Sequence, residues 1–138
     1  MSRENVEIVR RMFESLGGSE LRFPAEFLDP DVEWVNPPYA AEPGIRRGKA
    51  AFEQAAAGVS GAFDEFSFED NEVIDADEKV LVLSTFLVRG RGSGVEHRQP
   101  QGYLWTLRDG RAVRFEWFNS HAEALEAAGL RAGSEVGD

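Results

Sequence analysis

Hydrophobic and polar positions follow a helical period in the first part of the chain and a two-residue period in the second. From Val6 to Leu16, apolar residues recur every three or four positions, which predicts an amphipathic helix that ends at the glycine pair at 17–18. Similar patterns predict a short helix over 21–28 and a longer one over 49–59. The alanines of the longer helix indicate close packing against a sheet.

Five stretches have the pattern of β-strands. The first covers 32–36 and is ended by the proline pair at 37–38, because proline cannot continue a ladder of backbone hydrogen bonds. After Gly61 the others follow one another: an alternating stretch from Phe66 to Ile74, then 79–89, 96–107 and 111–119. The stretch 79–89 is almost continuously apolar, which predicts a strand that is covered on both faces.

The dipeptide Asp109-Gly110 predicts a tight hairpin turn between the last two strands, because both positions tolerate positive φ. The register then follows by counting outward from the turn. On the more apolar face, which we take as the interior, it opposes Phe115 to Leu104, Trp117 to Gly102 and Asn119 to Pro100. Gly102 opposite a tryptophan leaves either a gap in the interior or a bend in the strand.

The predicted order of elements is two helices, a strand, a third helix, four strands and a terminal helix. Ser120 and Glu123 form a capping box that opens this last helix. Helices followed by an antiparallel meander are typical of the α+β class. We expect a curved antiparallel sheet that the N-terminal helices wrap into a cone, with a hollow whose mouth suits a small ligand. One domain spans 1–130, and 131–138 is expected to be a disordered tail.

Composition narrows the range of partners. The chain has 138 residues, with 15 Lys+Arg against 25 Asp+Glu and a formal net charge of −10. This balance disfavours nucleic acid and anionic membranes, which need a basic face. With no cysteine and only two histidines, far apart, neither a disulfide nor a metal or cofactor site is expected. No stretch resembles a signal peptide or reaches membrane-spanning length, so a cytoplasmic location is the expectation.

Four segments carry a resemblance to a known family: DPDVEWVNPP at 29–38, the helix start at 48–49, LRDGR at 107–111 and EALEAAGL at 123–130. With these segments the chain resembles the SnoaL-like branch of the nuclear-transport-factor-2-like superfamily over nearly its whole length. The resemblance implies an α+β cone and a homodimer formed through the sheet. That superfamily holds ketosteroid isomerases, polyketide cyclases, epoxide hydrolases and proteins that only bind or assemble, so the fold alone does not assign a function.

The resemblance also implies positions for catalytic groups, and this chain fills them with other residues. Ketosteroid isomerases have an Asp general base before a proline, where this chain has Asn36. They have an oxyanion-donating Tyr and a protonated Asp where it has Phe13 and Gly102. An amide cannot take a proton from carbon at neutral pH, so isomerase chemistry is not expected. The acidic positions of SnoaL-type cyclases correspond to Trp117, Asn119 and Ser120. The only carboxylate in that stretch, Glu116, is turned outward by the predicted register, and we assign no Asp-Arg-Asp set of the epoxide hydrolase kind.

Amide and phenol groups are the remaining candidates for polar contact with a ligand. By alternation Asn36 shares a face with Trp34, and Asn119 shares one with Trp117, where an amide without a partner is costly. Each amide can hydrogen-bond a ligand, or it can organise the turn or helix start beside it. Tyr39, in the loop near the mouth, is a further donor.

The hollow is expected to be lined, by ligand contacts or by core side chains, by Phe13, Trp34, Asn36, Tyr39, Gly102, Leu104, Phe115, Trp117 and Asn119. His97 is either a general base at the start of its strand or an exposed histidine at a loop edge. The weak candidates for catalysis are therefore Asn36, Tyr39, His97 and Asn119.

Three functions remain open. The first is binding of a small apolar or cyclic ligand without a strong acid/base pair. The second is an enzyme acting on a polyketide-like or cyclic substrate, for which a shifted pKa of His97, or of Glu33 if it faces the hollow, would be a sign. The third is a scaffold dimer whose cone is filled by Phe13, Phe52, Phe115 and Trp117.

Overall fold

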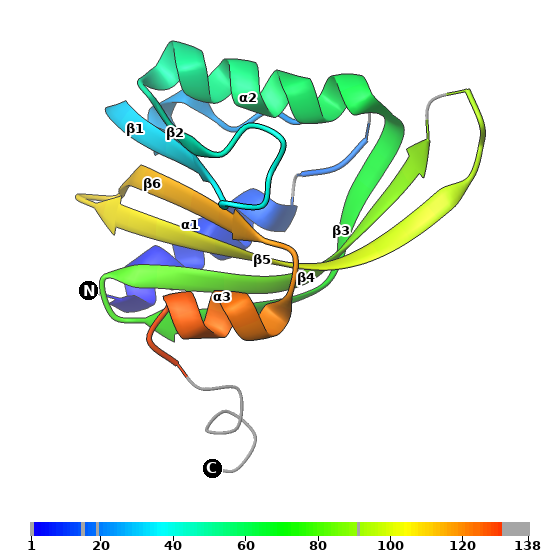
Figure 1. Ribbon diagram of the computed structural model, residues 1–138. Helices are drawn as coiled ribbons and strands as arrows, with labels where there is room; N and C mark the ends of the chain where they lie inside the picture. Colours follow the sequence, from blue (N-terminus) through cyan, green and yellow to red (C-terminus); the bar gives the residue numbers. More distant parts are fainter. Residues whose placement is uncertain (1, 15, 19, 91, 131–138) are drawn as a thin grey trace.

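A strongly curved sheet of six strands forms the centre of the computed structural model, which describes residues 2–14, 16–18, 20–90 and 92–130 (Figure 1). The elements in chain order are α1 (Ser2–Glu14), the short 3-10 helix η1 (Ala25–Phe27), β1 (Leu28–Asn36), β2 (Gly44–Arg47), α2 (Lys49–Ala62), β3 (Phe63–Ala76), β4 (Lys79–Gly90), β5 (Glu96–Arg108), β6 (Arg111–Phe118) and α3 (His121–Ala127). Helices α1 and α2 pack on one face of the sheet and α3 on the other. The predicted tail at 131–138 lies outside the described residues.

The strand order is β2-β1-β6-β5-β4-β3, and every neighbouring pair except β1 and β6 is antiparallel. The α+β class and the curved sheet are thus confirmed, and the sheet is mixed rather than wholly antiparallel. Strand β1 joins the sheet beside β6, after most of the chain has intervened. A crossover of that length permits parallel pairing, which a short hairpin cannot.

Two predicted segments fold differently from their pattern. The segment predicted as a helix over 21–28 is helical only at η1, and its last residue, Leu28, begins β1. Pro24 disfavours helical geometry at Phe23 and cannot donate to a helical turn. The backbone N–H of Leu21 instead donates to Ser60 Oγ of α2 at 2.5 Å. Within the predicted loop at 39–48, β2 pairs with β1 and adds an edge strand. The helix predicted over 49–59 extends to Ala62.

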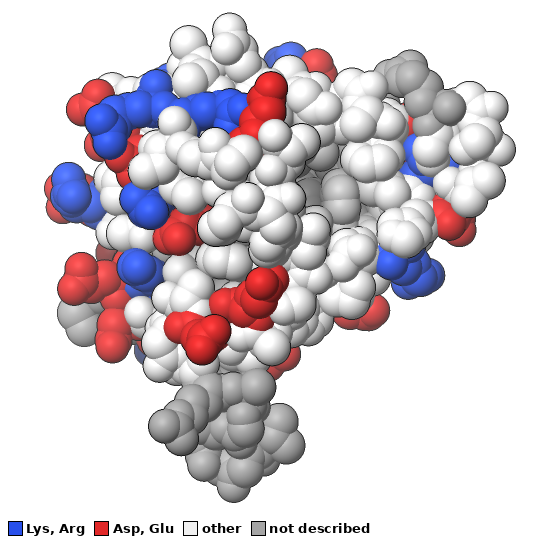
Figure 2. All heavy atoms as spheres, viewed as in Figure 1, with Lys and Arg blue, Asp and Glu red and all other residues white. Residues whose placement is uncertain are grey.

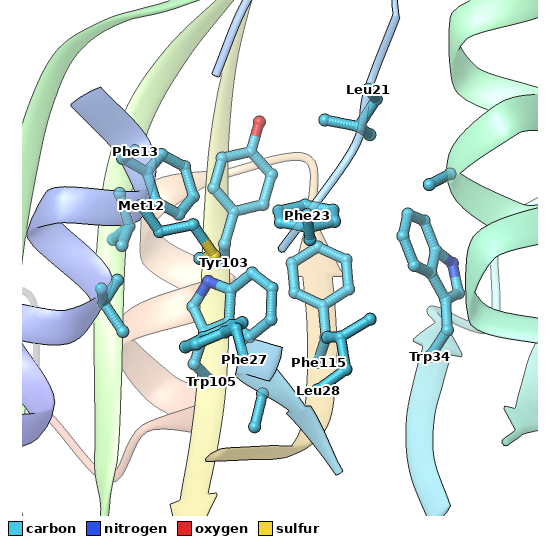
Figure 3. Packing of buried hydrophobic residues seen from close by; sticks show 14 of the residues in the cluster. Met12, Phe13, Leu21, Phe23, Phe27, Leu28, Trp34, Tyr103, Trp105 and Phe115 are labelled. Carbon is cyan, nitrogen blue, oxygen red and sulfur yellow. The ribbon is translucent and has the colours of Figure 1, made fainter. Parts of the chain in front are cut away.

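Aromatic rings fill the core on the face that α1 and α2 cover (Figure 3). Trp105 is fully buried, and its ring centroid lies 4.5 Å from that of Phe115. Phe115 in turn lies 4.7 Å from Trp34, so rings from three strands contact one another. Strand β4 alternates between this core and the α3 side: Val80 and Val82 face α1 and α2, whereas Leu81 and Leu83 face α3. The prediction that 79–89 is covered on both faces is confirmed.

The β5–β6 hairpin turns at Asp109 and Gly110 as predicted, with φ values of 53° and 78°. The register beyond the turn differs from the prediction. Leu107 pairs with Ala112 but Thr106 pairs with Arg114, so one residue of β6 is bulged out of the ladder. Because side chains alternate, this shift moves the paired residues of β5 from Thr106 back to Gly102 to the opposite face relative to β6.

Because of the bulge, two of the predicted lining residues do not face the interior. Phe115 pairs with Trp105, and Trp117 with Tyr103, so tyrosine and tryptophan of β5 face the interior. Gly102 and Leu104 face α3 instead. A Cβ built on Gly102 would lie 2.2 Å from Ala124 Cβ, so the glycine is neither a gap in the hollow nor simply a bend: its lack of a side chain lets α3 sit against the sheet. The predicted cap of α3 is confirmed, since Ser120 Oγ accepts from Glu123 N at 3.0 Å.

No helix in the described part of the chain combines the length and apolar character needed to cross a membrane.

Candidate functional site

A cavity of about 890 Å³ opens between the concave face of the sheet, α2 and the loop that joins β1 to β2. In Figure 2 a recess surrounded mainly by uncharged side chains lies below α2, while charged side chains gather toward the edge formed by β1, β2 and the β5–β6 hairpin. Phe13, Phe115 and Trp117 line this cavity, and Phe52 lies fully buried behind it. The side chains that would fill the cone of a scaffold dimer therefore leave it open.

The wall of the cavity is largely aromatic. Strands β1 and β6 contribute Trp34, Phe115 and Trp117. Strands β3, β4 and β5 contribute Phe68, Phe86 and Tyr103, and the N-terminal segments contribute Phe13 and Phe23. Such a wall favours apolar ring compounds through burial of surface and ring–ring contact.

Asn36 joins two of these rings. Its Oδ1 accepts hydrogen bonds from Trp34 Nε1 at 2.8 Å and from Trp117 Nε1 at 2.6 Å. Its Nδ2 donates to the backbone carbonyl of Glu42 at 2.8 Å. Since an indole N–H can only donate, the carbonyl end of the amide must face the two tryptophans. The amide therefore both positions the aromatic wall and anchors the β1–β2 loop, and it keeps one N–H for other contacts.

A second polar series runs along β5 to the end of β6. Tyr103 donates to Gln101 Oε1 at 2.5 Å, and Gln101 Nε2 donates to Asn119 Oδ1 at 2.8 Å. Burial raises the pKa of Tyr103 well above its usual range, so the phenol stays protonated at neutral pH. Along this side the cavity presents neutral groups that are already hydrogen-bonded to one another.

Tyr39 connects the mouth of the cavity to α3. Its hydroxyl accepts from the backbone N–H of Asn119 at 2.8 Å and donates to Glu123 Oε1 at 2.9 Å. Desolvation raises the pKa of Tyr39, and the Glu123 carboxylate raises it further. The ring packs edge-on to Trp117 with centroids 6.4 Å apart. The loop that carries Tyr39 is thus held at one end by Asn36 and at its tip by α3.

One ion pair lies at the rim. Arg46 Nη2 contacts Glu42 Oε1 at 2.6 Å, and both residues line the cavity. The side chain of Arg46 is 30% exposed and that of Glu42 is 79% exposed. Together with Tyr39 and Tyr103, these are the ionisable residues among the described residues of the lining.

Most of the residues predicted from the sequence come together at this cavity. Seven of the nine predicted lining residues line it: Phe13, Trp34, Asn36, Tyr39, Phe115, Trp117 and Asn119. Gly102 and Leu104 are displaced by the bulge. His97 is exposed, opposite Val88 near the other end of β5, and does not belong to the lining.

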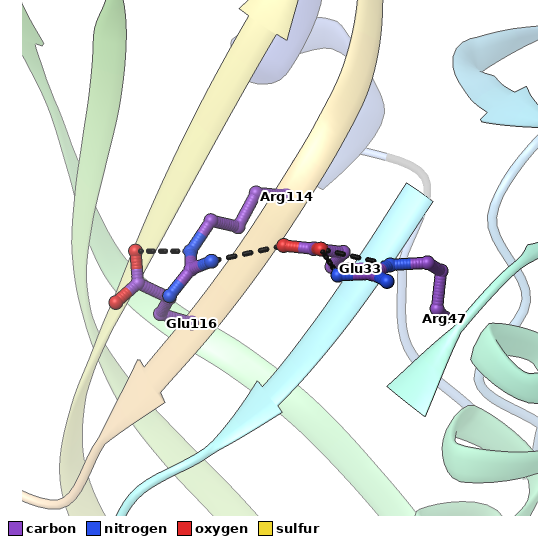
Figure 4. A network of polar contacts seen from close by, with 4 residues as sticks. All are labelled: Glu33, Arg47, Arg114 and Glu116. Carbon is purple, nitrogen blue, oxygen red and sulfur yellow. Dashed lines mark hydrogen bonds and ion pairs between the residues drawn. The ribbon is translucent and has the colours of Figure 1, made fainter. Parts of the chain in front are cut away.

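Glu33 does not face the hollow. It lies on the outer face of the sheet, between Arg47 Nη2 at 2.5 Å and Arg114 Nη1 at 2.9 Å (Figure 4). Arg114 also contacts Glu116 at 3.2 Å, which places Glu116 on the outer face as predicted. The hydrogen bond from Arg47 is the main cause that lowers the pKa of Glu33, and the charge of Arg114 adds to it. The ion pairs of Glu33 join β1 to β2 and to β6. The lowered pKa reflects these pairs and is no sign of catalysis at the cavity.

Sequence reasoning missed Arg46 and Gln101 as lining residues, and its register turned Tyr103 away from the hollow. Arg46 belongs to β2, which has no strand signal beyond a single Ile in a loop rich in Pro and Gly. Tyr103 and Gln101 alternate in the sequence as a strand face should. The predicted register, which had no bulge, placed both on the outer face.

With this geometry established, the chain can be compared with known proteins. Residues 9–115 match the family model described as a SnoaL-like domain. This match covers most of the chain, which belongs to the SnoaL-like family. Among curated proteins, none matches this chain.

Solved structures agree with the family. An NTF2-like protein of unknown function from Burkholderia pseudomallei K96243 is 25% identical with a TM-score of 0.66, covering 89% of this chain and 95% of its own. A candidate SnoaL-like polyketide cyclase from Jannaschia sp. CCS1 is 20% identical with a TM-score of 0.67, covering 92% of each chain. TerC, co-crystallized with polyporic acid, is 23% identical with a TM-score of 0.64, covering 91% of this chain and 98% of its own.

Proposed function

We propose that this chain binds a small, largely apolar ring compound in the cavity beneath α2, without the catalytic set of ketosteroid isomerases. The open, aromatic cavity of about 890 Å³ carries the proposal. Its volume lies within the range of about 300–1,000 Å³ that small-molecule sites usually have. That the similar fold of TerC was co-crystallized with polyporic acid supports a ligand of this general kind.

The three isomerase positions support the negative half of the proposal. The oxygen of Asn36 accepts from two indoles and has no proton to exchange. Phe13 lines the cavity without a hydroxyl, and Gly102 lies beneath α3 on the other face. No step of proton abstraction and return can be assigned to these positions.

The first test is a thermal-shift screen with cyclic ketones, steroids, epoxides and aromatic polyketide fragments. A compound present at a hundred times its dissociation constant adds roughly 2.7 kcal/mol of stability, which raises the melting temperature by several degrees in a domain of this size. Turnover of a compound that binds would add the enzymatic function, the alternative prediction for this site.

A matched pair of variants on α2 locates the binding site. Ala55 lines the cavity, whereas Ala57 is exposed on the same helix and lies outside the lining. Ala55→Phe places a ring in the cavity, so it should abolish the ligand-induced shift. Ala57→Phe should keep the shift. A panel without any stabilising compound, or a hit that survives in Ala55→Phe, would contradict the proposal.

A further inference from the structure

We infer that the ligand of this cavity is an acidic ring compound, whose carboxylate or enolate oxygen is bound by Arg46 while its ring lies against the aromatic wall. This inference rests on the proposed function, because it names the chemical class of ligand for the same cavity.

The position of Arg46 in β2 directs it to the cavity. Arg46 pairs with Trp34 across the β1–β2 ladder, and directly opposed residues share a face of the sheet. Its neighbour Arg47 points to the other face and binds Glu33. The two consecutive arginines thus lie on opposite faces of the sheet. Among the described lining residues, Arg46 is the only one with a permanent positive charge.

The present partner of Arg46 leaves room for a ligand. Its Nη2 donates to Glu42 Oε1, but Glu42 is 79% exposed at the rim. Ion pairs with so exposed a partner are weak, because water and salt compete with them. A guanidinium carries five N–H donors in a planar fork that matches an oxyanion, and the Glu42 contact uses one of them. Arg46 can therefore bind a ligand oxygen beside Glu42 or in its place.

The hydrogen bonds around Arg46 also favour a ligand that accepts hydrogen bonds over one that donates them. On the same face of β1, Asn36 has committed its oxygen to two indole N–H groups and retains one N–H. The hydroxyl of Tyr39, also at the mouth, accepts from Asn119 and donates to Glu123. At this end of the cavity Asn36 and Arg46 keep N–H donors for a ligand, and the carboxylate of Glu42 is already paired with Arg46. An oxyanion satisfies these donors, whereas an ammonium group would be repelled by Arg46 and would compete with it for the Glu42 carboxylate.

Because the chain is negatively charged overall, its preference for an anionic ligand depends on the contact with Arg46. With a formal charge of −10, the protein repels anions at long range. A preference for an anion must therefore come from a cation at the site itself. If Arg46 supplies it, removal of this one side chain should remove the preference.

Three naphthalene probes with different groups at the same ring position test the inference: naphthoate, acetylnaphthalene and naphthylmethylamine. Titration calorimetry at neutral pH should show naphthoate binding most tightly and naphthylmethylamine most weakly. Arg46→Met should weaken naphthoate by roughly 10- to 100-fold, as for loss of a charged hydrogen bond, and leave acetylnaphthalene within about twofold. Arg47→Met, which removes the same charge one residue away, should leave naphthoate binding unchanged. Glu42→Gln should strengthen naphthoate by a few fold, since it removes the competing carboxylate.

The outcomes separate the two proposals. If acetylnaphthalene binds the wild-type chain as tightly as naphthoate, or if Arg46→Met and Arg47→Met behave alike while all the probes still bind, the acidic-ligand inference is overturned and the ligand-binding cavity stands. If none of the three probes binds the wild-type chain, the proposed function fails with it. Thermal unfolding of each variant without ligand confirms that it is folded before binding is compared.

Discussion

At the residue scale, the side chain of Asn36 makes three hydrogen bonds at the end of β1. Its side chain joins Trp34, Trp117 and the carbonyl of Glu42, so one amide holds two rings of the cavity wall and the loop at its mouth. Both indole N–H groups depend on the same oxygen. Loss of that oxygen leaves two donors without their partner, which costs more than loss of a hydrogen bond between exposed groups.

Asn36→Leu should therefore lower the free energy of unfolding by about 2–4 kcal/mol, because each partly buried N–H left unpaired costs roughly 1–3 kcal/mol. Asn36→Asp should cost less, since a carboxylate still accepts from both indoles. Urea unfolding followed by tryptophan fluorescence measures both variants. A leucine variant as stable as the wild type would mean that water replaces the amide without loss.

The carboxylate of Glu33 makes a contribution to stability that depends on pH, because its pKa is lowered in the folded chain. Around the ordinary carboxyl value of about 4.3, the unfolded chain then binds more protons than the folded one, so stability rises with pH. The contribution is complete above that value and is lost as the pH falls through the lowered pKa of Glu33.

Glu33→Gln should thus destabilise the chain by about 1–3 kcal/mol at neutral pH, the range for hydrogen bonds to charged groups, and the difference from wild type should shrink below about pH 4. Unfolding curves over a pH series measure it. Glu65→Gln is the control, since Glu65 pairs with Arg89 at 59% exposure and should have little effect. A constant difference from pH 3 to pH 7 would rule out titration of Glu33 as its cause.

At the scale of elements, the docking of α3 depends on a missing side chain in β5. Ala124 of α3 lies over Gly102, and Leu125 packs with Leu81, Leu83 and Leu104 on the outer face of the sheet. The cap at Ser120 starts the helix at the end of β6, so the helix turns back over the strands. The contact therefore needs both the helix start at Ser120 and the missing side chain at Gly102.

Gly102→Ala should lower the free energy of unfolding by about 1–3 kcal/mol, as overpacking of a core usually does. Its new Cβ would overlap Ala124 Cβ, so Ala124→Gly in the same chain should recover part of the loss. Chemical unfolding of the two single variants and the double variant gives the coupling. Gly58→Ala is the control, because nothing lies within 4 Å of a Cβ at that helical position. Absence of coupling would place α3 farther from the sheet.

At the scale of the whole molecule, the sheet separates two surfaces. The concave face holds the aromatic cavity, and the outer face carries α3 beside a strip of alternating charges formed by Glu33, Arg47, Arg114 and Glu116 (Figure 4). The homodimer through the sheet stays a prediction. Since α3 covers the apolar part of the outer face, a sheet-to-sheet contact has this charged strip available. A strip of both signs can complement a second copy of itself.

We expect light scattering of the intact chain to give twice the 15.3 kDa of a single copy. Arg114→Glu should shift the mass toward the monomer, because it leaves Glu33 and Glu116 facing a like charge in both copies. Raised salt should act in the same direction. A wild-type mass of 15.3 kDa at every concentration would contradict the dimer.

Much of the fold and of the candidate site could be predicted from local pattern. The first helix, α2, the central strands, the turn at 109–110 and the cap at Ser120 each have a signal that a few neighbouring residues carry. The site residues Trp34, Asn36 and Tyr39 follow from the strand that ends at the proline pair. Arg46 could not be found this way, because its role depends on β2 pairing with β1.

The sequence by itself determined the class of fold and the aromatic character of the interior, because residue types and periodicity are local properties. Only the tertiary structure decided which face of β5 meets the cavity, through a bulge of one residue in β6. It also decided that Arg46 lies inside and that Gly102 receives α3. These outcomes depend on contacts between segments far apart in the chain, and hydrophobic periodicity contains no information about register across them.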